Sequence, residues 1–253
     1  MKLNDSQTFP IGLKRNLRFF LTNPAPCPYL PGKRERKAFT SLAVSDADYL
    51  HNTLSQSGFR RSQGIAYRPA CPACNACRSV RVDARGFQLS RNQRRVVSRN
   101  KDLVRTPVPA QPTRGQFRLL REYLKARHDG GGMSEMTYRD YVNMVSDSPV
   151  RSLIFEYRLG EDLDSPLVAC SITDVLRDGL SMVYTFFDPK EEKRSLGRLM
   201  ILDHIRQVQE LGLPHVYLGY WINGSAKMDY KRDYQPLEVL EGETWRPLTD
   251  DNT

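Results

Sequence analysis

Residues 181–222 read SMVYTFFDPKEEKRSLGRLMILDHIRQVQELGLPHVYLGYWI, and this stretch decides the fold. Ser181 to Phe187 predicts a strand, and a long helix follows from about Glu191 to Leu211. Gly212 ends that helix, and the chain returns as a strand from His215 to Ile222. One apolar residue in every three marks the face of the helix that is expected to be buried: Leu196, Leu199, Leu202, Ile205 and Val208.

Two helices and a hairpin are expected before this unit. Apolar residues at spacings of three and four predict amphipathic helices over Gln116 to Arg127 and Met136 to Val145, with a Gly-rich loop at 128–132 between them. Arg177-Asp178-Gly179 predicts a hairpin turn, because Asp-Gly suits tight turns between strands. The strands before that turn are expected over Ser152 to Leu159 and Leu167 to Leu176.

The order of these elements predicts an α/β fold (an α+β mixed sheet) of the GNAT-like acyltransferase type. In that arrangement the splayed ends of two neighbouring strands hold an acyl group, and the N-terminus of the following helix faces a phosphate. Arg194 to Leu199 resembles the Arg/Gln-x-x-Gly-x-Gly/Ala loop of that fold, although the second small residue is absent.

The first half of the chain is expected to contain short helices and strands around a cysteine-rich stretch. A short helix is expected from Ser45 to Leu54, and alternating residues predict strands at 59–68 and 78–84. The cysteine-rich stretch between those strands is interpreted as their turn. A basic helix begins at Ser90, and Pro107 to Pro112 is interpreted as a linker.

Charge separates the two halves of the chain. Residues 1–127 carry a balance of +18, whereas residues 128–253 carry −9. Two domains are therefore expected: a basic, Cys-rich N-terminal domain at 1–112 and a GNAT-like catalytic domain at 113–253. Such a basic half attracts polyanions, and RNA is favoured because no helix-turn-helix or zinc-finger pattern is visible. A solvated helix face is the alternative for the densest cations: Arg91, Arg94, Arg95 and Arg99.

The cysteines suggest a metal. Cys71, Cys74 and Cys77 are two residues apart, a spacing that lets thiolates converge on zinc or on an iron–sulfur cluster. Cys27 is the fourth candidate ligand. Loop or buried thiols without a metal are the alternative, and Cys170 is interpreted as a small core residue.

Other protein classes are excluded by composition. The longest apolar runs are far shorter than a membrane span, and Met1 to Ser6 lacks an apolar signal-peptide core. An odd number of cysteines, five, argues against a secreted disulfide framework. A cytoplasmic protein without membrane partners is expected.

Several strings resemble the aminoacyl-tRNA–protein transferases, and the resemblance covers nearly the whole chain from Cys27 to about Glu238. They are Cys27-Pro28-Tyr29-Leu30-Pro31-Gly32, the stretch from Tyr67 to Cys77, Tyr184-Thr185-Phe186-Phe187-Asp188-Pro189 with Arg194-Ser195-Leu196-Gly197, and Tyr217-Leu218-Gly219-Tyr220-Trp221-Ile222 running into Lys227-Met228-Asp229-Tyr230-Lys231.

The resemblance is to the bacterial branch of that family, which attaches leucine from Leu-tRNA to N-terminal Asp or Glu. It implies a role in marking proteins for degradation by the N-degron (N-end rule) pathway and no need for coenzyme A. The longer eukaryotic branch attaches arginine and carries a Cys-x-x-Cys pair where this chain has Cys27-Pro28-Tyr29-Leu30, so one family thiol is missing here.

An aminoacyl-tRNA ester is already activated, so the reaction requires positioning and charge stabilisation but no cofactor. The proposed catalytic residues are Tyr184, Arg194, Ser195, Gly197, Lys227 and Tyr230. The proposed substrate-binding residues are Tyr67, Arg78, Arg91, Arg94, Arg95, Arg99, Arg198, Tyr220, Trp221 and Lys231. Among these, Arg78, Lys227 and Lys231 are the candidates for holding the acidic side chain of the acceptor.

Structural roles are the alternative for several of these residues. Tyr184, Tyr220 and Trp221 would serve equally as core aromatics, and Lys227 and Lys231 as an exposed helix face. Three alternative functions remain open: arginyl transfer from Arg-tRNA, a non-enzymatic zinc-ribbon RNA-binding protein, and a coenzyme-A-dependent acetyltransferase.

Overall fold

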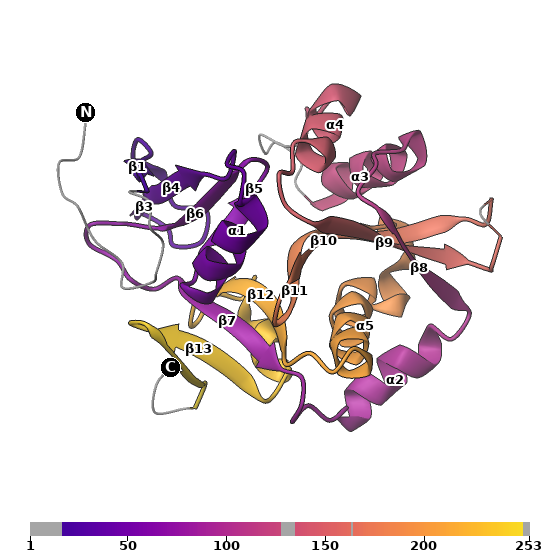
Figure 1. The fold of residues 1–253 in the computed structure, drawn as a ribbon. Coiled ribbons are helices and arrows are strands. Elements are labelled where there is room, and N and C mark those ends of the chain that lie inside the picture. Colours follow the sequence, from indigo (N-terminus) through magenta and orange to yellow (C-terminus); the bar gives the residue numbers. More distant parts are fainter. Residues whose placement is uncertain (1–16, 128–134, 163, 250–253) are drawn as a thin grey trace.

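An eight-stranded sheet forms the centre of the molecule and takes strands from both halves of the chain (Figure 1). The computed structural model describes residues 17–127, 135–162 and 164–249, so Met1 to Ser6 and the Gly-rich loop at 128–132 lie outside it. The strand order is β14-β13-β7-β12-β11-β10-β9-β8. The bounds are Arg78–Asp83 (β7), Leu103–Pro109 (β8), Ser152–Leu159 (β9), Leu167–Leu176 (β10), Gly179–Phe187 (β11), His215–Trp221 (β12), Leu237–Glu241 (β13) and Thr244–Pro247 (β14).

Neighbouring strands of this sheet are antiparallel except β11 and β12, which run parallel. A parallel pair needs a crossover, and the chain supplies it through the 3-10 helix η1 (Pro189–Arg194) and helix α5 (Leu196–Glu210). The predicted order of hairpin, strand, loop, long helix and strand is therefore confirmed.

Helices cover both faces of the large sheet. Helices α3 (Arg114–Arg127) and α4 (Tyr138–Ser146) lie on one face, and α5 with α2 (Arg91–Arg99) lies on the other (Figure 1). Alternation along β10 divides its side chains between two cores, since Ala169 joins the α5 cluster and Cys170 joins the α3–α4 cluster. Cys170 is fully buried, which confirms its interpretation as a core residue.

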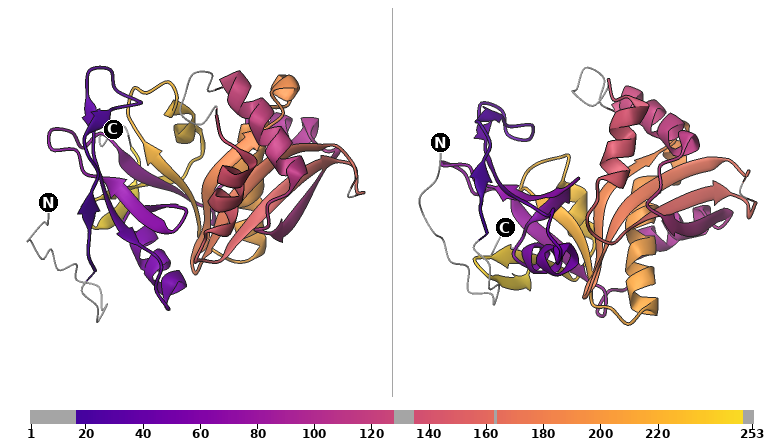
Figure 2. Two further views of the ribbon diagram at one scale, coloured as in Figure 1. Left: turned by 90° about the horizontal axis from the view of Figure 1, so that it is seen from above. Right: turned by 45° about the horizontal axis from the view of Figure 1, so that its top comes forward.

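A second sheet lies beside the β7–β13 side of the first (Figure 2). Its order is β1-β4-β6-β5, and helix α1 (Ala47–Gln56) packs over it around Leu50, Leu54 and Phe59. Two residues each from β2 and β3 form a separate ribbon. The bounds are Phe20–Leu21 (β1), Ala25–Pro26 (β2), Arg34–Glu35 (β3), Lys37–Ser41 (β4), Arg60–Ser62 (β5) and Ile65–Pro69 (β6).

One buried carboxylate joins the two sheets. Asp174 of β10 accepts two 2.7 Å hydrogen bonds from the Arg61 guanidinium of β5 and lies 3.0 Å from His51 Nε2 of α1. Ser152 donates a further bond of 2.7 Å. Burial favours the neutral acid, but the hydrogen bonds from His51 and Arg61 outweigh it and hold the pKa of Asp174 at about 2. Asp174 is therefore a charged, fully satisfied anchor.

Two local predictions for the first half are wrong. Residues 59–68 form two short strands, β5 and β6, because Gln63 turns the chain in the left-handed region with φ 50°. The cysteine stretch is also not a hairpin turn, since β6 lies in the smaller sheet and β7 in the larger. Local alternation identifies a strand but not the sheet that it joins.

Two predicted boundaries also differ. Pro107 and Pro109 belong to strand β8 and not to a linker; β8 is an edge strand paired only with β9, where prolines are tolerated. Helix α5 starts at Leu196 and not at Glu191, because Ser195 has φ 57° and interrupts the helix. The division into domains at residue 112 stays a prediction, and β7 and β8 before it share the large sheet with the strands after it.

We predict that Asp174→Asn lowers the free energy of unfolding by about 3–5 kcal/mol, because it leaves the buried Arg61 charge uncompensated. In the wild type, the contribution of Asp174 is present above its unfolded pKa near 3.8 and is lost as pH falls towards 2. Urea unfolding at pH 7 measures the loss. Asp164→Asn, at an exposed position, is the matched control and should change stability by less than about 0.5 kcal/mol. Equal effects of the two substitutions would contradict the role of the network.

Candidate active site

The parallel strands β11 and β12 separate after three residue pairs. Gly179, Leu180 and Ser181 face His215, Val216 and Tyr217, and beyond them each strand pairs only with its antiparallel neighbour. A register shift bends each strand at the separation, at Val183 in β11 and at Leu218 in β12. Beyond this point the edges of β11 and β12 that face each other are not hydrogen-bonded to one another within the sheet. Such an opening is what the predicted acyl cleft requires.

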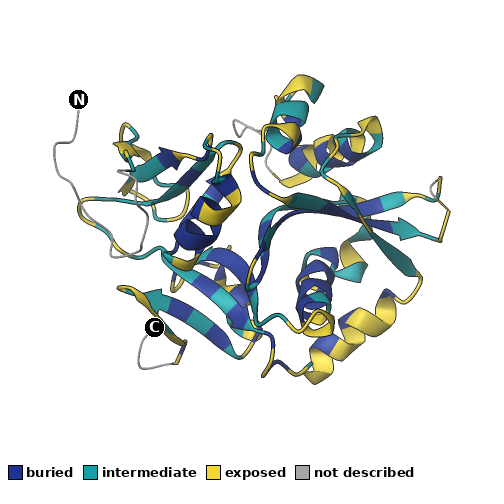
Figure 3. Cartoon of the chain, viewed as in Figure 1, coloured by how far each residue is buried: buried dark blue, intermediate teal, exposed yellow. Residues whose placement is uncertain are grey.

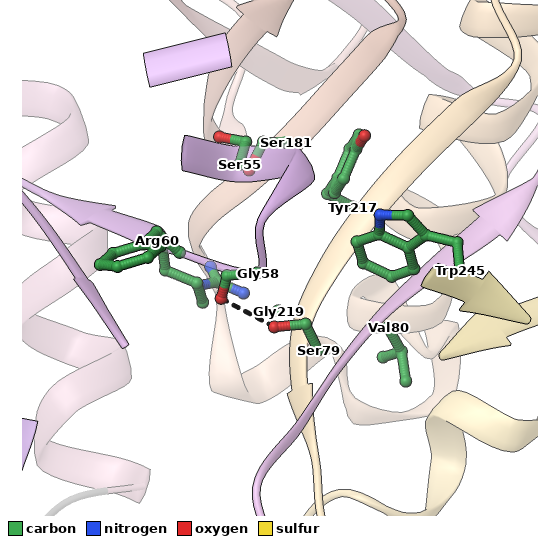
Figure 4. A pocket seen from close by; sticks show the side chains of 10 residues that line it. Ser55, Gly58, Arg60, Ser79, Val80, Ser181, Tyr217, Gly219 and Trp245 are labelled. Carbon is green, nitrogen blue, oxygen red and sulfur yellow. Dashed lines mark hydrogen bonds between the residues drawn. The ribbon is translucent and has the colours of Figure 1, made fainter. Parts of the chain in front are cut away.

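Arg60 of the smaller sheet reaches into this gap. Its Nη2 donates to the carbonyl of Met182 at 2.6 Å and to that of Val183 at 3.3 Å. On the other side lies Gly219, whose φ is +79° and where an added Cβ would be 1.3 Å from Arg60 Nη1. Figure 4 shows Arg60 and Gly219 together in the wall of a small pocket that also includes Ser181. The glycine is thus required by the approach of the guanidinium.

The position of Arg60 follows from its neighbour. Successive residues of a strand point to opposite sides, so Arg61 bonds to Asp174 while Arg60 points to the gap between β11 and β12. The buried anchor thereby fixes the side chain that enters the cleft.

Lys231 approaches the gap from the side of β12. It lies in the 3-10 helix η2 (Asp229–Asp233), is 7% exposed, and donates from Nζ to the carbonyl of Tyr220. Burial, and then the positive charge of Arg60, lower its pKa to about 7. The alternative interpretation of Lys231 as part of an exposed helix face is therefore wrong, whereas Lys227 is exposed in the loop before η2.

Tyrosines form the walls around these two cations. The rings of Tyr67 and Tyr220 lie 6.3 Å apart, and the Tyr220 hydroxyl donates to the carbonyls of Gly58 and Tyr67 at 3.0 Å each. Tyr184, just beyond the bulge of β11, has a buried hydroxyl that meets no hydrogen-bond partner in the described part of the chain. Burial raises the pKa of Tyr184 and of Tyr220, so both stay neutral.

Tyr230 completes the group on the open side, where it is 38% exposed. Burial raises its pKa, and the charge of Arg60 opposes that shift. The structure thus brings four of the predicted residues together at the gap, Tyr67, Tyr220, Tyr230 and Lys231, whereas Tyr184 packs against the α3–α4 core.

Other predicted residues are engaged elsewhere. Arg194 makes a bidentate ion pair with Asp102 at 2.8 and 2.9 Å and a third bond to Glu191. Arg78 bonds to Glu241 at 2.6 Å. Trp221 is fully buried in the α5 core, so its interpretation as a core aromatic is confirmed.

The loop before α5 has a defined geometry. Ser195 is left-handed and does not cap the helix with its side chain. Gly197 packs on Phe187, where an added Cβ would be 3.4 Å from the ring. Arg198, in the first turn, lies 3.1 Å from Asp233 of η2 and is about half exposed. These contacts place the start of α5 against both β11 and the segment that carries Lys231.

The basic helix α2 lies next to this loop. Ser90 and Gln93 form a capping box at its start, and Asn100 at its end donates to the carbonyl of Arg194 at 2.9 Å. Its outer face is exposed (Figure 3). The exposed arginines of this face are those predicted to bind RNA: Arg91, Arg94, Arg95 and Arg99.

The four cysteines of the first half come close to one another. Burial, followed by the charges of Cys27, Cys71 and Cys74, raises the pKa of Cys77 to about 11. Among residues 17–127, 135–162 and 164–249, however, no group of three or more His, Cys, Asp or Glu side chains converges as a metal site requires. The zinc or iron–sulfur centre stays a prediction, and no step of the chemistry below depends on it.

Two residues of the site were missed by the sequence analysis. Gly219 within strand β12 carried a signal, because a strand glycine marks a bulge or a close approach. Arg60 carried none, since it is one of 25 lysines and arginines in the first 127 residues. Only the packing of the two sheets distinguishes it.

Comparison with known proteins identifies the family of this chain. A family model described as "Arginine-tRNA-protein transferase, C terminus" matches residues 115–241, and the corresponding N-terminal model matches residues 25–95. The chain belongs to this family of aminoacyl-tRNA–protein transferases. It is an aminoacyltransferase that uses an aminoacyl-tRNA as donor and proteins as acceptors.

Similar proteins extend over the full length. An aspartate/glutamate leucyltransferase of Hyphomonas neptunium is 68% identical over 99% of this chain and 100% of that protein. One of Phenylobacterium zucineum is 54% identical over 95% of this chain and 93% of that protein. The crystal structure of FemX covers 83% of this chain and 70% of its own at 8% identity with a TM-score of 0.51, which confirms the GNAT-like fold.

Membership of this family decides between some of the alternatives. A non-enzymatic zinc-ribbon RNA-binding protein is not supported, because both halves match a transferase family. The names of the relatives do not favour arginyl transfer. None of the helices within the described ranges is long and apolar enough to cross a membrane.

We predict that Arg95→Ala weakens tRNA binding and lowers the slope of log K against log salt concentration by about 1, because one phosphate contact is lost. Fluorescence anisotropy over a series of salt concentrations measures both quantities. Arg246→Ala, at another exposed arginine on β14, is the control and should leave the slope unchanged. The same slope in Arg95→Ala and wild type would show that α2 does not contact RNA.

We predict that Gly219→Ala reduces transfer on the order of tenfold or more, because its Cβ displaces Arg60 from the gap. Gly212→Ala is a matched control: Gly212 has φ +68° but meets no atom within 4 Å of an added Cβ. Both substitutions carry backbone strain of about 1–2 kcal/mol, and thermal unfolding of each variant measures any further loss of stability from the displaced Arg60. Equal transfer rates in the two variants would contradict the importance of this contact.

Proposed function

We propose that the protein transfers leucine from Leu-tRNA to the N-terminal Asp or Glu of other proteins. The observation that carries this proposal is the 68% identity, over 99% of the chain, to a protein named aspartate/glutamate leucyltransferase. The cationic gap between β11 and β12 supports it, since an acidic N-terminus is the acceptor that such a site favours.

Basic side chains outside the gap would bind the tRNA, and the gap itself would hold its aminoacyl end. The exposed arginines of α2 and the start of α5 lie next to each other and suit the phosphates near the acceptor end of a tRNA. Tyr67 and Tyr220 offer aromatic faces on which a terminal base can stack. The ester of the leucyl group would then enter between the separated strands.

The chemistry is aminolysis of an activated ester. The neutral α-amine of the acceptor attacks the carbonyl carbon, a C–N bond forms, and the C–O bond to the tRNA ribose breaks. The amine proton ends on the released ribose oxygen. An α-amine has a pKa near 8, so a sufficient neutral fraction exists at pH 7 without a strong base. Positioning and charge stabilisation are therefore the main requirements, and no cofactor is needed.

Charged groups at the gap suit the developing oxyanion. The cations Arg60 and Lys231 give the gap a positive potential. The exposed ring of Tyr230 supports a substrate contact there. We place the reaction in the cytoplasm, where charged tRNA is made, and the product would carry an N-terminal leucine that marks it for degradation.

We predict that the purified enzyme adds leucine to peptides beginning with Asp or Glu when supplied with Leu-tRNA, and adds nothing to a peptide beginning with Asn. Mass spectrometry of the peptide measures the added residue. Arg-tRNA in place of Leu-tRNA should give no product. Addition of arginine would support the arginyl alternative, and no addition from either donor would overturn the proposal.

A further inference from the structure

We infer that Arg60 and Lys231 together bind the side-chain carboxylate of the acceptor's N-terminal residue and so determine acceptor specificity. This inference rests on the proposed function and assigns its selectivity to two residues. It keeps Lys231 from the three sequence-based candidates and adds Arg60, whereas Arg78 is paired with Glu241 and Lys227 lies on an exposed loop.

The first argument is that these two cations lack a counter-ion. Arg61 is buried, Arg81 and Arg194 are partly buried, and they bond to Asp174, Glu238 and Asp102. No carboxylate of the described residues pairs with Arg60 or Lys231, which bond only to main-chain carbonyls. Desolvated cations without an anion are unfavourable, and a bound carboxylate would relieve that cost.

The second argument is position. Arg60 is bonded to the carbonyls of Met182 and Val183 in β11, and Lys231 to that of Tyr220 in β12. Arg60 also lies against Gly219 of β12, so both cations are at the gap that is expected to hold the ester carbonyl. Asp and Glu carry their carboxylate on a short stem from the α-carbon, so a carboxylate between the cations leaves the α-amine close to that carbonyl.

The third argument is unused hydrogen-bonding capacity. Arg60 uses Nη2 in its two bonds, while its Nε and Nη1 bond to no described residue. Lys231 has three protons and donates to one carbonyl. The pair can thus donate several charge-assisted bonds to a planar carboxylate. An anion there would also favour the charged form of Lys231, whose pKa is lowered to about 7 by burial and by Arg60.

A carboxylate suits the site better than an RNA phosphate does. Lys231 is 7% exposed and bonds to the main-chain carbonyl of Tyr220, whereas phosphates of a folded RNA need an open basic surface. The exposed arginines of α2 provide that surface. The two anions of the reaction would therefore bind at separate places.

The test is acceptor discrimination in Arg60→Gln and Lys231→Met, with steady-state kinetics on peptides beginning with Asp, Glu or Asn and saturating Leu-tRNA. We expect the KM for Asp and Glu peptides to rise by about 10-fold to 100-fold, since a hydrogen bond to a charged group is lost. The preference for Asp over Asn should fall by the same factor, and the Kd for Leu-tRNA should be unchanged. Arg60→Lys keeps the charge and should restore part of the preference.

Arg246→Gln, at an exposed site on β14, is the control and should behave as the wild type. Circular dichroism shows whether each variant folds, and direct titration with the Asp peptide measures its binding. If Arg60→Gln or Lys231→Met does not fold, Arg60→Lys provides the test in its place. An unchanged preference for Asp in both Arg60→Gln and Lys231→Met would overturn the inference, as would a loss of tRNA affinity with unchanged peptide KM. Failure of the proposed function would instead appear in the wild type, as absence of leucine transfer.

Discussion

Only three residue pairs join β11 to β12, and the rest of the site depends on that early end of the parallel pairing. A strand bulge on each side turns the two strands apart, at Val183 and at Leu218, so the sheet opens at its centre and not at its edge. The opening exposes main-chain groups in a partly buried place. Arg60 and Lys231 bind three of the carbonyls there, which gives the opening its positive charge.

The smaller sheet reaches the candidate site because of a single buried anion, Asp174. Asp174 holds Arg61, and the alternation of strand β5 then directs Arg60 into the gap. Arg61, which forms a buried ion pair, and Arg60, which lies in the gap, are thus consecutive residues whose side chains point to opposite sides of β5. In this chain the arrangement places the N-terminal region against the large sheet.

The structure agrees with only part of what the charge difference between the two halves predicts. Exposed arginines of α2 lie beside the loop that begins α5, so the basic half does provide a surface for a polyanion close to the cleft. The same half also supplies β7 to the middle of the large sheet and Arg60 to the gap. The charge count predicts that the first half binds the donor and the second half carries out the chemistry. In the structure the first half contributes to both regions.

The sequence alone determined the crossover from β11 through α5 to β12, the hairpin before it, the family, and the aromatic residues of the cleft. Those features depend on local periodicity and on recognisable strings, which the chain carries wherever it folds. Tertiary structure decided which cations are free and which are paired: it joined Arg194 to Asp102 and Arg78 to Glu241, and left Arg60 and Lys231 without a carboxylate among the described residues. Pairing depends on which distant side chains meet in space, and alternation within a strand cannot specify that.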